Sequence, residues 1–181
     1  MKKIWRLVIV LSLVFAIFSP IADAKRPPVP TPFPNISSKS VAQKVKSGTY
    51  NYYGVKLGNS FATVKKQWGT PTTKKVYRSS ITIPEYNYGP LGNLKIKGQA
   101  NGSVAESKAK FDQILIATKS HTKHEYKKVM KNFGPSKDIR TSGNIKMVSW
   151  TKGHSHTIIY FKKVGSKYYA YSFSNGLVGV R

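Results

Sequence analysis

The sequence contains the same helix-ending pattern twice, and this repetition constrains the fold more than any other feature. Apolar residues with the i, i+3, i+7 spacing of one helical stripe occur at Phe61, Val64 and Trp68 and again at Tyr126, Val129 and Phe133. Each stripe is followed by a glycine and then a proline, which is typical of a helix C-terminus. We therefore expect two short amphipathic helices that end at Gly69 and Gly134.

The residues before these stripes predict where the helices begin. Asn59 or Ser60 is a suitable N-cap for the first helix, and residues 122–125 (TKHE) have the form of a capping box for the second. A further short helix is expected from Ser37 or Ser38 to about Lys46.

Each of the two helices is followed by segments that predict β-strands. They cover residues 74–78, 83–88, 91–97 and 111–118 after the first helix, and 144–150, 157–164 and 167–174 after the second. Turns are expected at Gly89-Pro90, Asn101-Gly102, Lys152-Gly153, Gly165-Ser166 and Asn175-Gly176. The pattern predicts an α+β fold of two tandem helix-plus-antiparallel-meander modules, with the helices packed on one face of the sheet. A single α+β domain with a coincidental Gly-Pro repeat is the alternative.

Residues 1–24 have the features of a secretory signal peptide. Three basic residues precede an apolar run at 7–18, and Ala22 and Ala24 form a small-x-small cleavage pattern. We expect cleavage near Ala24 and a protein that is secreted, extracellular or associated with the cell wall; an uncleaved anchor is the alternative. Because the chain has no cysteine, a lipobox anchor and disulfides are excluded, and we expect a bacterial exported protein.

The remaining chain is expected to divide into three parts. Residues 25–48 form a leader with five prolines and the short helix, residues 49–118 form the first α+β module, and residues 119–181 form the second. A proline-rich leader favours an extended polyproline conformation. We expect it to be a solvated spacer.

The charge balance is strongly basic. The chain has 31 lysines and arginines and six acidic residues, and without residues 1–24 it keeps 28 and five, a net charge of +23. Such a surplus favours polyanionic neighbours. Only four of the 28 cations are arginine, the residue that reads bases and clamps phosphates. We therefore expect an anionic cell-wall polymer or an acidic membrane surface as a partner, and only non-specific attraction to nucleic acid.

Lysines on the outer faces of the two helices are the predicted anionic-polymer site. These residues are Lys65, Lys66, Lys127, Lys128 and Lys131. Lysines on an outer helix face ordinarily serve solubility, but here acidic partners at i±4 are scarce.

A longer motif carries a family resemblance. Residues 53–64 (YGVKLGNSFATV), continued by residues 68–71 (WGTP), resemble the opening of SmpA/OmlA (BamE-like) and β-lactamase-inhibitor-protein-like modules, as in secreted Bacillus-type proteins. Residues 125–135 repeat the later half of the motif. The resemblance implies tandem helix-on-sheet modules that bind a protein or an envelope component without catalysis. In the inhibitor-like members, the sheet presents a concave aromatic surface to an enzyme.

Aromatic residues on the predicted strands supply such a surface here. The predicted partner-binding residues are Tyr86, Tyr88, Trp150, Tyr160, Tyr168, Tyr169 and Tyr171. Tyrosine is favoured at interfaces because it combines a large area with a hydroxyl group. Aromatic residues also fill cores and favour strands, so the sequence leaves open which of them are exposed.

Histidines offer the alternative function, a secreted basic hydrolase of nuclease type. A zinc site or an acid–base pair would draw on His121, His124, Glu125, His154 and His156. His154 and His156 fall in a predicted hairpin, and Glu125 is explained by the capping box. We therefore expect no enzyme, no catalytic residues, no metal and no cofactor. A membrane-active protein, the third hypothesis, would need a long amphipathic helix that the sequence lacks.

Overall fold

The computed structural model describes residues 26–89, 93–119 and 122–179, so the expected signal peptide lies outside the described residues. The described helices are α2 (Lys39–Lys46), α3 (Phe61–Trp68), the 3-10 helix η2 (Glu106–Lys108) and α4 (Tyr126–Phe133). The strands are β1 (Thr73–Arg78), β2 (Ile81–Tyr88), β3 (Leu94–Asn101), β4 (Lys110–Ala117), β5 (Asp138–Ser142), β6 (Ile145–Lys152), β7 (Ser155–Val164) and β8 (Lys167–Leu177).

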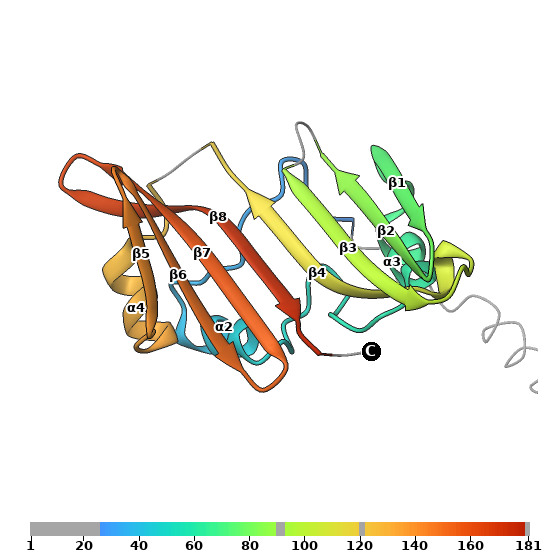
Figure 1. The fold of residues 1–181 in the computed structure, drawn as a ribbon. Helices are drawn as coiled ribbons and strands as arrows, with labels where there is room; N and C mark the ends of the chain where they lie inside the picture. The colour runs from blue at the N-terminus through green and yellow to red at the C-terminus, as the bar shows by residue number, and fades with distance from the viewer. Residues whose placement is uncertain (1–25, 90–92, 120–121, 180–181) are drawn as a thin grey trace, which may run out of the picture.

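The strands form one antiparallel sheet in the order β1-β2-β3-β4-β8-β7-β6-β5, with helices α2, α3 and α4 behind it in Figure 1. The predicted α+β class is confirmed. Strands β1 to β4 follow α3, strands β5 to β8 follow α4, and the last strands of the two groups pair at the centre of the sheet. Strand β5 was not predicted, because its segment DIRTS carries a single large apolar residue and is mostly exposed. None of the helices in the described ranges is long and apolar enough to cross a membrane.

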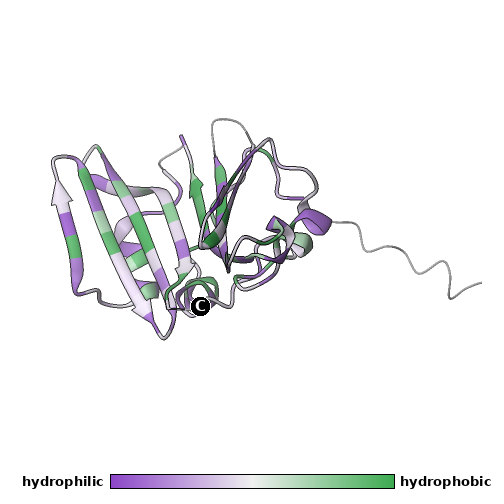
Figure 2. Ribbon diagram, turned by 45° about the vertical axis from the view of Figure 1, so that its right-hand side comes forward, coloured by the Kyte–Doolittle hydropathy of each residue, from purple (hydrophilic) through white to green (hydrophobic). Residues whose placement is uncertain are grey.

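One row of buried side chains crosses the middle of the sheet. Leu94 pairs with Ile116, Ile116 with Phe173, Phe173 with Ile159, and Ile159 with Val148, and all five side chains are fully buried. Directly opposed residues point to the same face of a sheet, so this row defines the face that carries the core. Figure 2 shows the matching alternation of hydrophobic and hydrophilic residues along the strands. Burial of each such side chain contributes roughly 1.5–3 kcal/mol.

The predicted start of α3 and the predicted C-termini of α3 and α4 agree with the structure. Ser60 is the N-cap of α3, where its side chain accepts a hydrogen bond from the Thr63 amide at 3.2 Å. Gly69 and Gly134 follow the last turns of α3 and α4 with φ of 75° and 81°. A side chain with a Cβ rarely adopts this backbone conformation, so glycine is favoured at both helix ends.

The predicted capping box of α4 is wrong. The N-cap is Glu125, and no side-chain cap hydrogen bond forms there. The Glu125 carboxylate instead forms an ion pair with the Lys167 ammonium group at 3.2 Å. The helix begins later than the motif predicts because residues 123–125 connect to the sheet, where the His124 carbonyl accepts the Ala170 amide.

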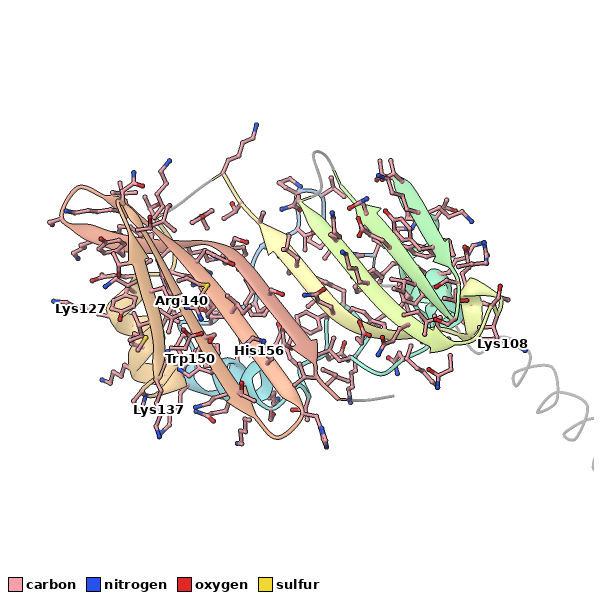
Figure 3. All side chains as sticks on the ribbon, in the orientation of Figure 1. Lys108, Lys127, Lys137, Arg140, Trp150 and His156 are labelled. Atoms are coloured by element: carbon pink, nitrogen blue, oxygen red, sulfur yellow. The ribbon has the colours of Figure 1, made fainter. Side chains whose placement is uncertain are left out.

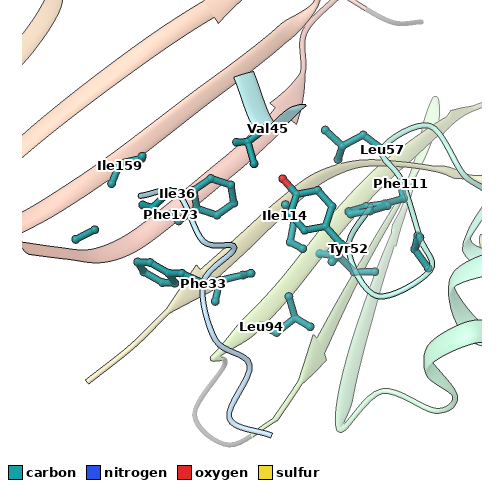
Figure 4. Close-up of a cluster of buried hydrophobic side chains, with 14 of the residues drawn as sticks. Phe33, Ile36, Val45, Tyr52, Leu57, Leu94, Phe111, Ile114, Ile159 and Phe173 are labelled. Carbon is teal, nitrogen blue, oxygen red and sulfur yellow. The ribbon is translucent and has the colours of Figure 1, made fainter. Parts of the chain in front are cut away.

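The leader is not a solvated spacer, which corrects the sequence prediction. Phe33 and Ile36 are 7% and 0% exposed, and the ring centroid of Phe33 lies 6.3 Å from that of Phe173 (Figure 4). The Thr31 backbone amide donates to the Asn93 side-chain oxygen, and the Asn93 side-chain amide donates to the Thr31 carbonyl at 3.2 Å. The Asn93 side chain therefore makes the two backbone hydrogen bonds that a neighbouring strand would otherwise make with the leader. The leader packs on the central strands.

Asn175 is a buried polar junction on β8. Its side-chain amide donates to the Val45 carbonyl at 3.1 Å, to Ser155 at 3.1 Å and to Thr157 at 3.0 Å. Its side-chain oxygen accepts the Tyr52 hydroxyl proton at 2.9 Å. The side chain thus joins α2, the loop that follows it, and strand β7.

The predicted turn at Asn175-Gly176 is consequently wrong. Strand β8 continues to Leu177, and Gly176 pairs with Gln113 on one side and His156 on the other. An Asn-Gly pair is a frequent turn signal, but here the buried hydrogen bonds of Asn175 hold it in a strand.

We predict that Asn175→Ala destabilises the chain by about 2–4 kcal/mol, because it leaves buried groups such as the Tyr52 hydroxyl and the Val45 carbonyl without their partner. Urea denaturation followed by circular dichroism measures the loss. Asn144→Ala, at an exposed position between β5 and β6, is the matched control and should change stability by less than about 0.5 kcal/mol. Equal effects of the two substitutions would contradict the role of Asn175.

Candidate partner-binding surface

Three of the aromatic residues predicted to bind a partner lie in the core instead. Tyr86, Tyr88 and Trp150 are 2%, 6% and 4% exposed. The Tyr86 ring meets Phe61 of α3 edge-on with centroids 4.7 Å apart, and the Trp150 indole N–H donates to the Gly134 carbonyl at 3.0 Å. Because these side chains project from the sheet toward the helices, the prediction is wrong for all three.

Tyr168 and Tyr169 lie on opposite sides of β8. The Tyr168 ring packs 6.5 Å from Tyr126 of α4, and the Lys146 ammonium lies 5.0 Å from the Tyr168 centroid and 4.8 Å from the Tyr126 centroid. This cation–π cluster stabilises the end of the helix layer. Tyr169 pairs with Lys162 near the end of the β7–β8 hairpin and is half-buried. Tyr169 therefore lies at the margin of the sheet face that the helices do not cover.

Tyr160 and Tyr171 lie on the side of the sheet without helices. Tyr160 follows the buried Ile159, and successive strand residues point to opposite faces. A register shift between Tyr160 and Phe161 brings Tyr171 to the same side, where the two tyrosine rings lie 6.3 Å apart. Both side chains are half-buried, so part of each ring is available to a partner.

Aliphatic side chains outside the predicted partner-binding set join these tyrosines. Each alternates with a core residue of its strand, and each is half-buried; they are Leu115, Met147 and Ile158. We call the surface formed by Leu115, Met147, Ile158, Tyr160 and Tyr171 the open sheet face. The sequence contains a signal for this surface, because in these strand segments apolar residues occur on both faces of the strand and not on the core face alone.

A basic depression borders the open sheet face on β3 and β4. It measures about 230 Å³ and is lined by Lys95, Lys97, Gln113 and Leu115. Glu85 forms ion pairs with Lys95 at 2.9 Å and with Lys97 at 3.0 Å. Burial raises the pKa of the Glu85 carboxyl, but these two ammonium groups outweigh burial and hold the pKa below its usual value. The carboxylate therefore fixes both lysines at the edge of the apolar surface.

The predicted lysine site lies on the helices, away from the open sheet face. All five of its residues are exposed, on α3 and α4: Lys65, Lys66, Lys127, Lys128 and Lys131. Figure 1 shows these two helices at opposite ends of the sheet, and Figure 3 shows Lys127 at the outer end of the α4 side. The lysines therefore form two separate cationic areas.

The histidines within the described ranges lie in different surroundings. His124 is 3% exposed and stacks on Phe33 with ring centroids 5.9 Å apart. His154 lies at the β6–β7 turn, and His156 lies on β7, whereas His121 is outside the described residues. The part of the chain that the structure describes contains no group of three or more His, Asp or Glu residues that could hold a metal. These described residues therefore do not form the zinc site of the alternative hydrolase.

Comparison with known proteins gives structural neighbours only. No protein-family model matches the chain, and no curated protein matches it. A DUF4309 family protein (YjgB) from Bacillus subtilis subsp. subtilis str. 168 is 10% identical with a TM-score of 0.48, and the match covers 78% of this chain and 98% of that one. A cysteine-rich secretory protein from Staphylococcus aureus subsp. aureus Mu50 is 8% identical with a TM-score of 0.41, covering 68% and 44%.

A third neighbour is a candidate β-lactamase inhibitor protein from Streptococcus mutans, 17% identical with a TM-score of 0.30, covering 74% of this chain and 93% of that one. An inhibitor-like protein is thus among the similar structures, and none of the three is described as BamE-like. Identities and TM-scores this low carry no property of those proteins over to this chain.

His124 makes the stability of the chain depend on pH. Burial, with a smaller contribution from Lys123, lowers the pKa of the imidazole from 6.5 to about 4. The His124 Nδ1 lies 3.0 Å from the Ser37 hydroxyl, and its Nε2 is buried without a hydrogen-bond partner. The folded state therefore favours neutral His124, and its contribution to stability is complete above pH 6.5 and is lost as the pH falls toward 4.

We predict that His124→Phe, which keeps the stacking on Phe33, removes this acid sensitivity. Between pH 7 and pH 4.5 the wild type should lose about 2 kcal/mol relative to the variant, after allowance for solvent screening. Urea midpoints at pH 7, 5.5 and 4.5 measure the difference. His154→Phe, at the exposed turn, is the control and should follow the wild type; the same behaviour from both variants would refute a special role for His124.

Proposed function

We propose that this chain is an exported, non-enzymatic binding protein with two binding surfaces. The open sheet face binds a protein partner, in the manner of an inhibitor-like module, and the helix lysines hold the protein on anionic polymers of the cell envelope. The proposal includes secretion after cleavage near Ala24.

The proposal also treats the fold as two tandem modules, residues 49–118 and 119–181. The repeated order of elements supports this division, since a helix and four antiparallel strands occur in each range. The two modules would share one sheet through the β4–β8 pair.

The open sheet face is the observation that carries the proposal. An antiparallel sheet that is packed on one side usually presents polar side chains to water on the other. Here the strands near its centre present aromatic and aliphatic side chains that are only half-buried. Tyrosine anchors surrounded by apolar and small residues are typical of interface hot spots. Strand β8 adds Ser172 and Ser174 beside Phe173, on the side away from the core. Because these side chains are small, the surface is lower along β8 than at the larger side chains of the neighbouring strands.

The charge around this face indicates the chemistry of the partner. Lys95 and Lys97 border it on β3, and Arg140 lies on β5, opposite Met147. We therefore expect a partner surface with apolar side chains surrounded by carboxylates, which the net charge of +23 that remains without residues 1–24 would also attract from a distance.

The partner surface is tested by truncation of the two tyrosines. Immobilised chain without residues 1–24 should retain a protein from culture supernatant, and the double variant Tyr160→Ala, Tyr171→Ala should retain at least about tenfold less. Tyr77→Ala removes a 56% exposed tyrosine from edge strand β1 and is the matched control. Equal retention by the three proteins would refute the proposed face, and hydrolysis of fluorogenic RNA or DNA that His156→Ala abolishes would favour the hydrolase instead.

The lysine surfaces are tested by salt elution from isolated cell walls. Bound protein should elute as NaCl rises from about 0.1 to 1 M, because the screening length falls from about 10 to 3 Å. Replacement of the five helix lysines by glutamine should lower the salt needed for elution. The control carries five glutamines at other exposed lysines: Lys44, Lys56, Lys152, Lys162 and Lys163.

Elution of the two glutamine variants at the same salt concentration would show that net charge, and not the helix surfaces, retains the protein. Elution that does not depend on salt at all would refute electrostatic retention.

A further inference from the structure

Asp112 is a carboxylate without an ion pair in a chain crowded with cations. The other four acidic residues in the described ranges each pair with a lysine or arginine: Glu85 with Lys95 and Lys97, Glu106 with Lys74, Glu125 with Lys167, and Asp138 with Arg140. Asp112 forms no such pair within the described chain. With 31 basic residues available, its lack of a partner needs a physical reason.

The backbone places Asp112 at an irregular point of the sheet. Lys97 pairs with Gln113 and Gly98 pairs with Phe111, so Asp112 is the extra residue of a β-bulge on β4. Gly98 is required on the opposite strand because a Cβ there would collide with the Lys110 carbonyl oxygen. A bulge redirects the side chain of its extra residue, and here that residue lines a pocket.

The pocket has three kinds of wall. It measures about 420 Å³, and its lining includes the partly buried apolar residues Ala100 and Leu177, the exposed lysines Lys108 and Lys110, and Asp112. This volume lies in the usual range for small-molecule sites. Neither lysine is close enough to Asp112 to form an ion pair, so the opposite charges remain available to different parts of a ligand.

The carboxylate is held there at a cost to stability. Burial raises the pKa of Asp112 to about 6, against a smaller lowering by its own backbone amide. At neutral pH the carboxyl is still mostly ionised, but its charged form is less stable in the folded chain than in the unfolded chain. A group that destabilises the fold and lines a pocket is typical of a binding residue.

We propose that this pocket binds a small zwitterion whose primary ammonium group pairs with Asp112 and whose anionic group pairs with Lys108 or Lys110. The apolar body of the ligand would lie against Ala100 and Leu177. A simple cation is disfavoured by the two lysines and by the overall positive charge, and a simple anion is disfavoured by Asp112. A divalent metal is disfavoured because the pocket offers a single carboxylate. This site is separate from the open sheet face, so it does not depend on the proposed function.

The test uses alanyl-alanine as the probe and amide chemical shifts of the ¹⁵N-labelled chain as the readout. We expect saturable shifts that map to residues 99–101, 108–112 and 177. N-acetyl-alanyl-alanine, which lacks the ammonium group, and alanyl-alaninamide, which lacks the carboxylate, should each bind at least about tenfold more weakly. Equal shifts from all three probes, or no shifts in these residues, would overturn the proposal.

Asp112→Asn separates a binding role from a structural one. The variant should bind alanyl-alanine at least about tenfold more weakly, yet its urea midpoint at pH 7 should be higher than that of the wild type, because the disfavoured charge is gone. Asp138→Asn makes the same chemical change at the exposed ion pair with Arg140 and should leave binding unchanged. Unchanged binding in Asp112→Asn would overturn the proposal, as would an equal loss in both variants.

Discussion

The pairing of β4 with β8 is the interaction on which the rest of the structure depends. It joins the four strands that follow α3 to the four that follow α4, from the Gln113–Gly176 pair to the Ala117–Ser172 pair. Ile116 and Phe173 meet within it, and both are fully buried. Without this ladder the two groups of strands would each expose a long hydrophobic edge, which is a state prone to aggregation.

The pairing of β4 with β8 also explains why the leader is buried. Helices α3 and α4 lie toward opposite ends of the sheet, so the core face of its central strands needs another cover (Figure 1). Phe33 and Ile36 of the leader and Tyr52 of the loop after α2 supply it (Figure 4). Two asparagines satisfy the polar groups that this arrangement buries: Asn93 pairs with the leader backbone, and Asn175 ties β8 to α2 and the Tyr52 loop. Hydrogen bonds of this kind favour one arrangement because any other leaves buried groups unpaired.

The two faces of the sheet separate the proposed tasks of the protein. One face is occupied by helices whose outer surfaces carry lysines, and the other remains open with half-buried tyrosines and aliphatic residues. A protein held electrostatically by its helices would keep the open sheet face available to a partner. The Asp112 pocket lies at the beginning of β4, beside the end of β8, and adds a site of different chemistry to the same joint.

The sequence by itself determined the local elements. Apolar spacing and glycine stops located α3 and α4, the cap of α3 was narrowed to Asn59 or Ser60, and seven of the strand segments were recognised, since each of these signals is contained within a few neighbouring residues. Only the tertiary structure decided which aromatic residues face water. Tyr86 and Tyr160 lie on equally plausible strands, yet one packs under α3 and the other lies on the open sheet face. The same holds for the turn expected at Asn175, the burial of Phe33 and the missing partner of Asp112. Each depends on contacts between residues far apart in the chain, and such contacts leave no periodic trace in the sequence.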